Sequence, residues 1–141
     1  MEKLEIVVVG ILLLIQSICD IRWKKIPLCV TVAGVVIGSM FFFWENKSWL
    51  ELGLSSLPGV MCLLFSKISR EALGYGDSYL LCMMGFFYSV EELLFILLLA
   101  MGLAGVVGVF LLIVWKKSRK YELPFVPFLF IAYGVNVWMR I

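Results

Sequence analysis

Six apolar runs alternate with short polar segments along the chain. They are Leu4–Cys19, Leu28–Trp44, Leu50–Ser66, Asp77–Val90, Leu93–Trp115 and Phe125–Met139. A helix needs roughly 20 residues to cross the hydrocarbon core of a bilayer. The fifth run reaches that length alone, and the others reach it with flanking residues. The pattern predicts an all-α membrane protein with about six transmembrane helices. Five spans is the alternative, because the fourth and sixth runs are short.

Composition agrees with a membrane environment. The chain has 141 residues, of which 63% are hydrophobic and only 16% are charged, whereas a soluble domain has about 25% charged residues. No Pro-, Gly- or Ser-rich linker divides it, so residues 1–141 are expected to form a single transmembrane domain surrounded by lipid. The first run is followed by Asp20 and a basic segment instead of a small-residue cleavage site, which argues against a cleaved signal peptide. A net charge of +2 gives no indication of a nucleic-acid partner.

The distribution of basic residues predicts an orientation. Nine of the twelve lysine and arginine residues lie in the segments after the first, third and fifth runs. Cytoplasmic loops of membrane proteins carry the excess of Lys and Arg. These three loops are therefore expected to face the cytoplasm, and both termini the outer side.

Several kinds of active site are excluded by residue content. The chain contains no histidine, which removes Ser-His and Cys-His pairs and the helical zinc-protease motif. Its four cysteines lie in or beside apolar runs without C-x-x-C spacing, and are interpreted as small buried side chains. No metal and no cofactor is expected.

The chain has two aspartates, Asp20 and Asp77. Asp20 ends the first run and Asp77 begins the fourth, so both adjoin loops on the same predicted membrane face. Acids at a lipid boundary are costly unless they face a wet or protein-lined site. Two carboxyls brought together favour a state in which one holds a proton and the other is ionised. The ionised one can activate water and the protonated one can polarise a carbonyl.

Two glycines, Gly74 and Gly76, precede Asp77. They permit backbone that a side chain would forbid, and so could open the helix start to a substrate strand. The simpler interpretation is a glycine-rich turn with Asp77 as helix cap. For Asp20 alone, a role in topology or at an interface is as good an explanation as catalysis. The joint placement of the two acids favours function.

Three segments resemble motifs of the prepilin peptidase family. Asp20-Ile-Arg-Trp-Lys-Lys-Ile-Pro27 resembles its D-x-R-x-x-x-I-P segment, Gly74-Tyr-Gly-Asp77 its GxGD motif, and Pro124-Phe-Val-Pro-Phe128 its P-F-x-P-F segment. The resemblance implies a GxGD aspartyl endopeptidase of the bacterial cytoplasmic membrane. By the same resemblance, Asp20 and Asp77 are the catalytic acids, and prepilins or pilin-like precursors are cut at the cytoplasmic face.

This sequence departs from the family pattern at three points. Tyr79 stands where the family often has lysine, and Leu28 where it often has asparagine. The paired C-x-x-C insertion linked to N-methylation is not present in these 141 residues. The chain therefore resembles the short, peptidase-only form of tight-adherence systems, and methyl transfer is not expected from it.

Other residues have both structural and functional interpretations. Arg22 and Lys25 are either positive-inside anchors or residues that frame Asp20. Pro27, Pro124 and Pro127 set the entry of helices and, by the resemblance, border the site. Interhelical hydrogen bonding is expected of the in-span amides Gln16 and Asn136. Close helix packing is expected of three glycines of the fifth run: Gly102, Gly105 and Gly108.

Two other functions compete with proteolysis. In a small proton-coupled transporter, paired acids would carry protons, but such acids usually lie near mid-membrane. A noncatalytic pilus-assembly subunit would be favoured if either aspartate were missing, and both are present. Presenilin-like proteases share GxGD but place their other acid in a Tyr-Asp context, which Cys19-Asp20 does not match.

Overall fold

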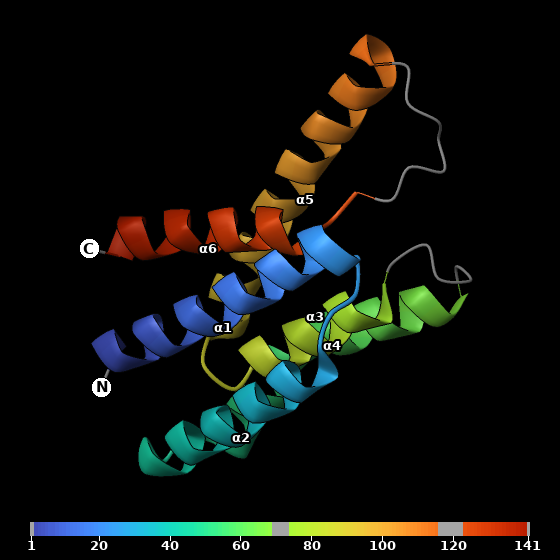
Figure 1. Cartoon of the computed structure of the whole chain (residues 1–141). Coiled ribbons are helices and arrows are strands. Elements are labelled where there is room, and N and C mark those ends of the chain that lie inside the picture. Colours follow the sequence, from blue (N-terminus) through green and yellow to red (C-terminus); the bar gives the residue numbers. More distant parts are fainter. Residues whose placement is uncertain (1, 69–73, 116–122, 141) are drawn as a thin grey trace.

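The computed structural model describes residues 2–68, 74–115 and 123–140. These residues form six helices and no strand (Figure 1). The helices are α1 (Glu2–Trp23), α2 (Leu28–Trp44), α3 (Trp49–Ile68), α4 (Tyr75–Met84), α5 (Val90–Val114) and α6 (Val126–Arg140). The all-α prediction is confirmed. The basic segment Lys116–Glu122 and the residue Arg70 lie outside the described residues.

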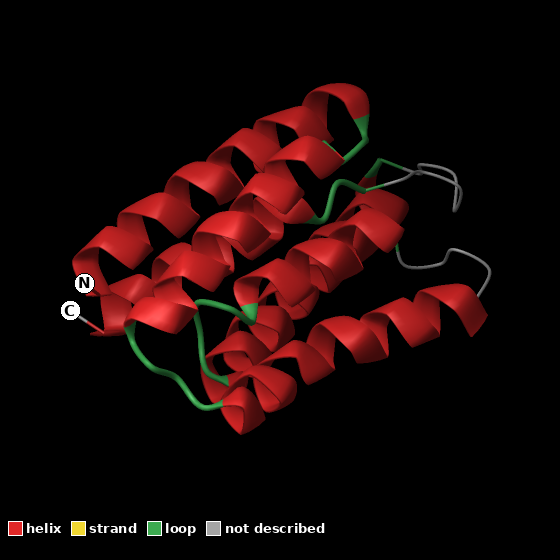
Figure 2. Ribbon diagram, turned by 90° about the horizontal axis from the view of Figure 1, so that it is seen from below, coloured by secondary structure: helices red, strands yellow, loops and turns green. Residues whose placement is uncertain are grey.

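The helices pack in a ring that does not follow chain order. The main contacts join α1 to α2, α2 to α4, α4 to α3, α3 to α5, α5 to α6, and α6 back to α1. Figure 2 shows the same bundle from below, with every described element a helix or a loop. Fully buried side chains of α1, α4, α5 and α6 fill the centre, among them Val9, Leu13, Leu80, Met84, Leu93, Ile96 and Leu129.

Three of the described helices, α1, α3 and α5, are long and apolar enough to cross a membrane. The helices α2 and α6 are apolar but shorter. The prediction for the fourth run is wrong at its end, because α4 stops at Met84 and a turn leads to α5 at Val90. Its 10 residues extend for about 15 Å, which is half of the hydrocarbon thickness of about 30 Å. The turn falls where Gly85 meets the backbone of α3; a Cβ there would lie 2.8 Å from the carbonyl oxygen of Ser55.

Close helix crossings use glycines of α2 and α3 but not those of α5. A Cβ on Gly34 would collide with Met83, and one on Gly59 would lie 2.6 Å from the backbone nitrogen of Cys82. By contrast, a Cβ at Gly102, Gly105 or Gly108 meets no described atom within 4 Å. The prediction of close packing for these three is therefore wrong within the described chain. The reason is that α5 leaves the bundle after Ala100, its last buried residue, and rises away from the other helices (Figure 1).

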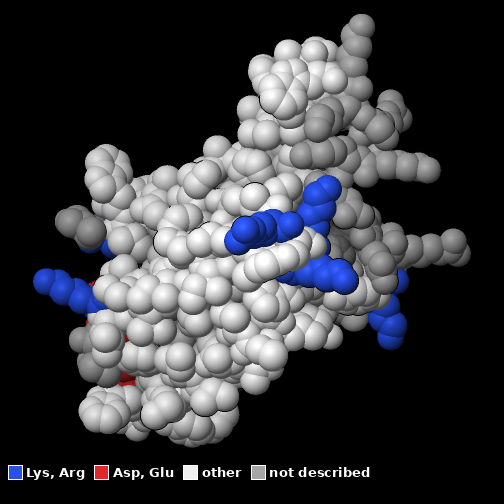
Figure 3. Space-filling model, in the orientation of Figure 1, with Lys and Arg blue, Asp and Glu red and all other residues white. Residues whose placement is uncertain are grey.

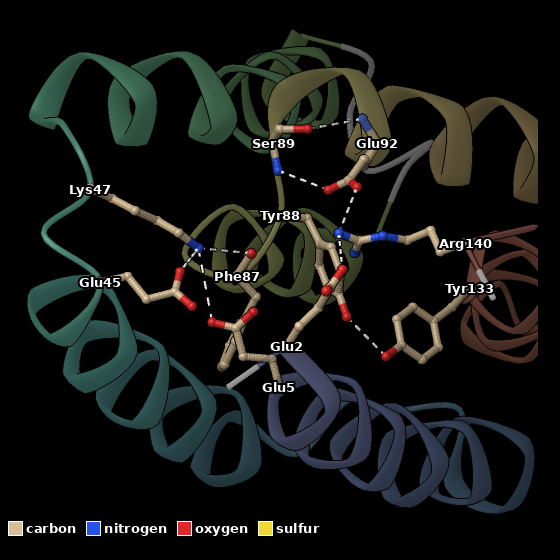
Figure 4. Close-up of polar contacts among 10 residues, drawn as sticks. All are labelled: Glu2, Glu5, Glu45, Lys47, Phe87, Tyr88, Ser89, Glu92, Tyr133 and Arg140. Atoms are coloured by element: carbon tan, nitrogen blue, oxygen red, sulfur yellow. Dashed lines mark hydrogen bonds and ion pairs between the residues drawn. The ribbon is translucent and has the colours of Figure 1, made fainter. Parts of the chain in front are cut away.

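Ion pairs tie the helix ends that lie far from Asp20 (Figure 4). The ammonium of Lys47 lies 2.9 Å from Glu45 and 3.9 Å from Glu5, and it donates to the carbonyl of Phe87 at 3.2 Å. Glu5 is only 6% exposed. A buried carboxylate needs such a partner, so Lys47 joins the loop after α2 to the start of α1.

A second set of contacts closes the same end between α1, α5 and α6 (Figure 4). The guanidinium of Arg140 lies 2.8 Å from Glu2 and 3.3 Å from Glu92. The hydroxyls of Tyr88 and Tyr133 are 2.9 Å apart, and Tyr133 also donates to a backbone carbonyl of α1 at 2.8 Å. The termini of the described chain are therefore held together at the end of the bundle opposite Asp20.

Candidate active site

Asp20 lies in the last turn of α1 and contacts the first residues of α6, more than 100 positions later in the chain. Its carboxyl is buried, with 8% of the residue exposed. The Oδ2 atom accepts a hydrogen bond from the backbone N–H of Val126 at 3.1 Å, and the backbone N–H of Phe125 lies beside this carboxyl. Charge-assisted hydrogen bonds of this kind hold a carboxylate in one orientation.

The two prolines of the Pro124–Phe128 segment explain why those amides are available. The first N–H groups of a helix have no partner within the helix, and proline has no N–H at all. The helical hydrogen bonds of α6 begin with Phe128 and Leu129, which both donate to the carbonyl of Phe125. Between the prolines, Phe125 and Val126 carry the amides that remain without a helical partner, and Asp20 accepts a hydrogen bond from that of Val126. Pro124 and Pro127 therefore flank the backbone segment that contacts Asp20.

Asp77 is the third residue of α4, and its carboxyl turns back over the start of its own helix. A Cβ added to Gly74, the residue before α4, would lie 3.2 Å from Oδ2 of Asp77. A Cβ on Gly76 would lie 2.9 Å from both Cβ and Cδ1 of Ile26. The two glycines thus make room for an acid on one side and for the Ile-Pro segment on the other.

Backbone freedom is not the reason for these glycines. Neither Gly74 nor Gly76 has a positive φ in the structure, so each conformation is one that any residue could adopt. The sequence-based explanation from permissive backbone is therefore wrong. The glycines are needed because Asp77 lies close to Gly74 and Ile26 lies close to Gly76.

The two aspartates lie near enough to influence each other. They interact electrostatically across the α1–α4 side of the bundle, and Asp77 interacts in the same way with Cys62 of α3. The site is thus formed by α1, α3, α4 and α6, with Pro27 in the loop that joins α1 to α2. Among the described residues, no group of three or more His, Cys, Asp or Glu side chains is arranged to hold a metal ion. The arrangement suits proton transfer between two carboxyls and a substrate.

The basic residues after Asp20 lie outside this cluster. Arg22 and Lys25 are exposed, and the guanidinium of Arg22 stands 5.8 Å from the ring centre of Trp23. Neither forms an ion pair with Asp20 in the described part of the chain. Figure 3 shows a group of blue side chains over the end of α1, with white surface around it and other charged side chains at the edges of the view. Their position agrees with the anchoring interpretation.

Three contributors to the site were not predicted individually. They are the amides of Phe125 and Val126 and the thiol of Cys62. The two prolines could have indicated these amides from the sequence. At a helix start that contains prolines, the few remaining N–H groups have no partner within the helix and need an acceptor elsewhere. Nothing in the local sequence marks Cys62, because it reaches the site only through the packing of α3 on α4.

Comparison with known proteins places the chain in a family. Residues 7–109 match the model of the type IV leader peptidase family. A prepilin leader peptidase/N-methyltransferase of Pseudomonas putida is 31% identical over 132 residues, covering 89% of this chain and 46% of the relative. Proteins of the same name from two other bacteria are each 30% identical to this chain. The one from Stutzerimonas stutzeri covers 85% of this chain and 44% of its own length. The one from Myxococcus xanthus covers 76% of this chain and 34% of its own length.

The chain therefore spans less than half the length of these relatives. No solved structure matches it significantly. The family match includes both Asp20 and Asp77. The chain belongs to the type IV leader peptidase family.

Proposed function

We propose that this chain is a membrane aspartyl endopeptidase that removes the leader peptide of type IV prepilins or pilin-like precursors, with Asp20 and Asp77 as its catalytic acids. The observation that carries the proposal is their convergence. The only two aspartates of the chain come from α1 and α4, and they interact electrostatically in one site. Membership of the type IV leader peptidase family supports the same substrate class.

The surroundings of Asp20 support a division of roles. Backbone N–H groups at a helix start favour the charged form of a carboxyl. Asp20 accepts a hydrogen bond from Val126, the first residue of α6, and the N–H of Phe125 lies beside it. Asp20 is thus the carboxylate that removes a proton from the attacking water. Asp77 is the carboxylic acid that donates its proton to the oxygen of the scissile carbonyl.

The reaction then balances without another reagent. Water adds to the carbonyl carbon, giving a tetrahedral diol, with its proton on Asp20 and the proton of Asp77 on the former carbonyl oxygen. Collapse of the diol breaks the C–N bond, the leaving amine takes the proton from Asp20, and Asp77 recovers its own from a hydroxyl. The products are a leader carboxylic acid and a new N-terminal amine, and the two aspartates return to their starting states.

The proposed substrate fits the position of the site at one end of the bundle. Asp20 and Asp77 lie near the end of α1 and the start of α4, where the chain leaves and re-enters the bundle. A precursor with a polar leader and an apolar helix would lie along the helices and present its junction there. We place this end at the cytoplasmic face, because Arg22, Lys25 and Lys67 lie on it.

Substituting each acid separately tests the function. Asp20→Asn and Asp77→Asn should each abolish cleavage of a prepilin-like precursor co-expressed with the protein, measured as the mobility shift of the precursor. Glu91→Gln is the matched control, because Glu91 lies at the first turn of α5, at the opposite end of the bundle. It should cleave at the wild-type rate. Full cleavage by either Asn variant would reject the dyad.

A labelling experiment tests the orientation separately. In a background without native cysteines, Lys25→Cys should react with a membrane-impermeant maleimide only in inverted vesicles. Glu91→Cys should react only in intact cells whose outer membrane has been permeabilised. The reverse pattern would move the site to the outer face and contradict the assignment of sides.

A further inference from the structure

A buried polar layer lies one helical turn below Asp20. Gln16 of α1 has none of its surface exposed, and Thr31 of α2 has 4%. The side-chain amide nitrogen Nε2 of Gln16 donates to Oγ1 of Thr31 at 3.3 Å. This bond confirms the interhelical role expected of Gln16, but it uses only half of the amide.

The hydroxyl of Thr31 determines whether the nitrogen or the oxygen of the Gln16 amide faces it. It donates to the backbone carbonyl of Pro27 at 3.5 Å, so it offers Gln16 a lone pair and accepts from Nε2. The amide oxygen Oε1 is thereby turned away from Thr31. Within the described residues, this buried oxygen has no hydrogen-bond partner. Buried acceptors are nearly always satisfied, and leaving one unsatisfied is costly.

The position of Gln16 between two layers limits what its free oxygen can meet. Below it the bundle is apolar and closely packed, because Gly34 of α2 packs against Leu12 of α1 and Met83 of α4. Above it lies Asp20, four residues further along α1 and therefore on the same helix face, about 6 Å away. The free oxygen lies at the boundary between the apolar core and the carboxyl site.

We propose that Gln16 is a positioning residue for Asp20: its amide oxygen accepts a hydrogen bond from a water molecule that also donates to the Asp20 carboxyl. This inference rests on the proposed function. A water that donates to both oxygens over about 2.8 Å each holds them about 4.5 Å apart, a distance that two side chains with Cβ atoms about 6 Å apart on one helix face can reach. The amides of α6 then hold the carboxyl from one side, and Gln16 holds it from below through the water.

Because this water touches no substrate, the inference predicts an effect on turnover and not on substrate binding. Gln16→Leu keeps the size of the side chain but removes the acceptor. It should lower kcat for precursor cleavage by about ten- to a hundredfold, the loss expected from a misplaced catalytic group, with KM unchanged. Thr31→Val should give a smaller loss of the same kind, because it frees the amide to rotate, and Thr31→Ser should restore the wild-type rate.

Asn136→Leu is the matched control. Asn136 is also a buried amide in a helix whose oxygen lacks a partner among the described residues. It lies ten residues beyond Val126 along α6, about 15 Å from the Asp20 contact. Asn136→Leu should leave kcat of the folded protein unchanged. Equal losses of kcat in both Leu variants, or an unchanged kcat in Gln16→Leu, would overturn the inference.

The same assay separates this inference from the proposed function. If Asp77→Asn cleaves the precursor at the wild-type rate, the dyad itself is wrong. If Asp77→Asn is inactive and Gln16→Leu retains full turnover, the dyad stands and only the role of Gln16 fails.

Discussion

Gly76→Ala is a substitution whose effect follows from one contact. A Cβ at this position would lie 2.9 Å from Cβ, 2.9 Å from Cδ1 and 3.2 Å from Cγ1 of Ile26. Carbon atoms in contact prefer about 3.5–4.0 Å. The added methyl therefore requires Ile26 or the start of α4 to move by roughly 0.5–1 Å. Asp77 is the next residue, so the movement falls on the proposed catalytic acid.

The size of the effect follows from general packing energetics. Overpacking by one methyl typically costs about 1–3 kcal/mol. If that free energy is lost from the transition state, the cleavage rate falls by about 5- to 150-fold. Since φ at Gly76 is not positive, backbone strain adds nothing to this estimate. The effect is steric, and it should respond to the size of residue 26.

The assay compares four proteins in reconstituted vesicles: wild type, Gly76→Ala, Ile26→Ala and the double variant. Ile26→Ala removes Cδ1 and Cγ1, two of the three close atoms, and so the double variant should recover part of the rate lost by Gly76→Ala. The control is Gly134→Ala in α6, where a Cβ meets no described atom within 4 Å. It should cleave normally, and thermal unfolding should show that every variant is folded.

Two outcomes would refute the reasoning. A Gly76→Ala protein with the wild-type rate would mean that the close approach of Ile26 does not constrain Asp77. A slow Gly76→Ala protein that gains nothing from Ile26→Ala would mean that the glycine is required for another reason, such as passage of the substrate backbone.

Three further predictions concern stability and are measured by thermal unfolding in detergent. Lys47→Ala leaves Glu5 buried without its ion pair and should lower the free energy of unfolding by about 1–3 kcal/mol. Adding Glu5→Gln to the same chain should restore most of this stability. An unchanged unfolding temperature in Lys47→Ala would contradict the role of the pair. Gly59→Ala pushes a methyl against the backbone of Cys82, which cannot rotate away, so it should destabilise by at least the 1–3 kcal/mol typical of overpacking; normal stability would show that α3 and α4 can separate freely. The hydrogen bond from Lys47 holds the pKa of Glu45 below its usual value of 4.5. This contact therefore stabilises the fold above pH 4.5, and the stabilisation is lost as the pH falls through the lowered pKa. Glu45→Gln should flatten this loss of stability at acidic pH, and an unaltered pH profile would exclude the contribution.

The sequence by itself determined the helical elements and the chemistry available to them. Apolar runs bounded by charged segments predict helices because a backbone in lipid must satisfy its own hydrogen bonds. Five of the six runs therefore correspond closely to observed helices. The lone pair Asp20 and Asp77, with histidine missing from the chain, restricted the candidate site to two carboxyls before any contact was known.

Tertiary structure alone decided which groups meet. The ring order of the helices brings the start of α6 to the end of α1, and this supplies Asp20 with the amides of Phe125 and Val126. It ends α4 at Met84 where the backbone of α3 approaches, and it leaves the glycines of α5 without a described neighbour. Local periodicity contains no information on such contacts, because they depend on how closely two distant backbones can approach. Glycine and proline mark where that approach is possible, but only the packed bundle shows which partner fills the space.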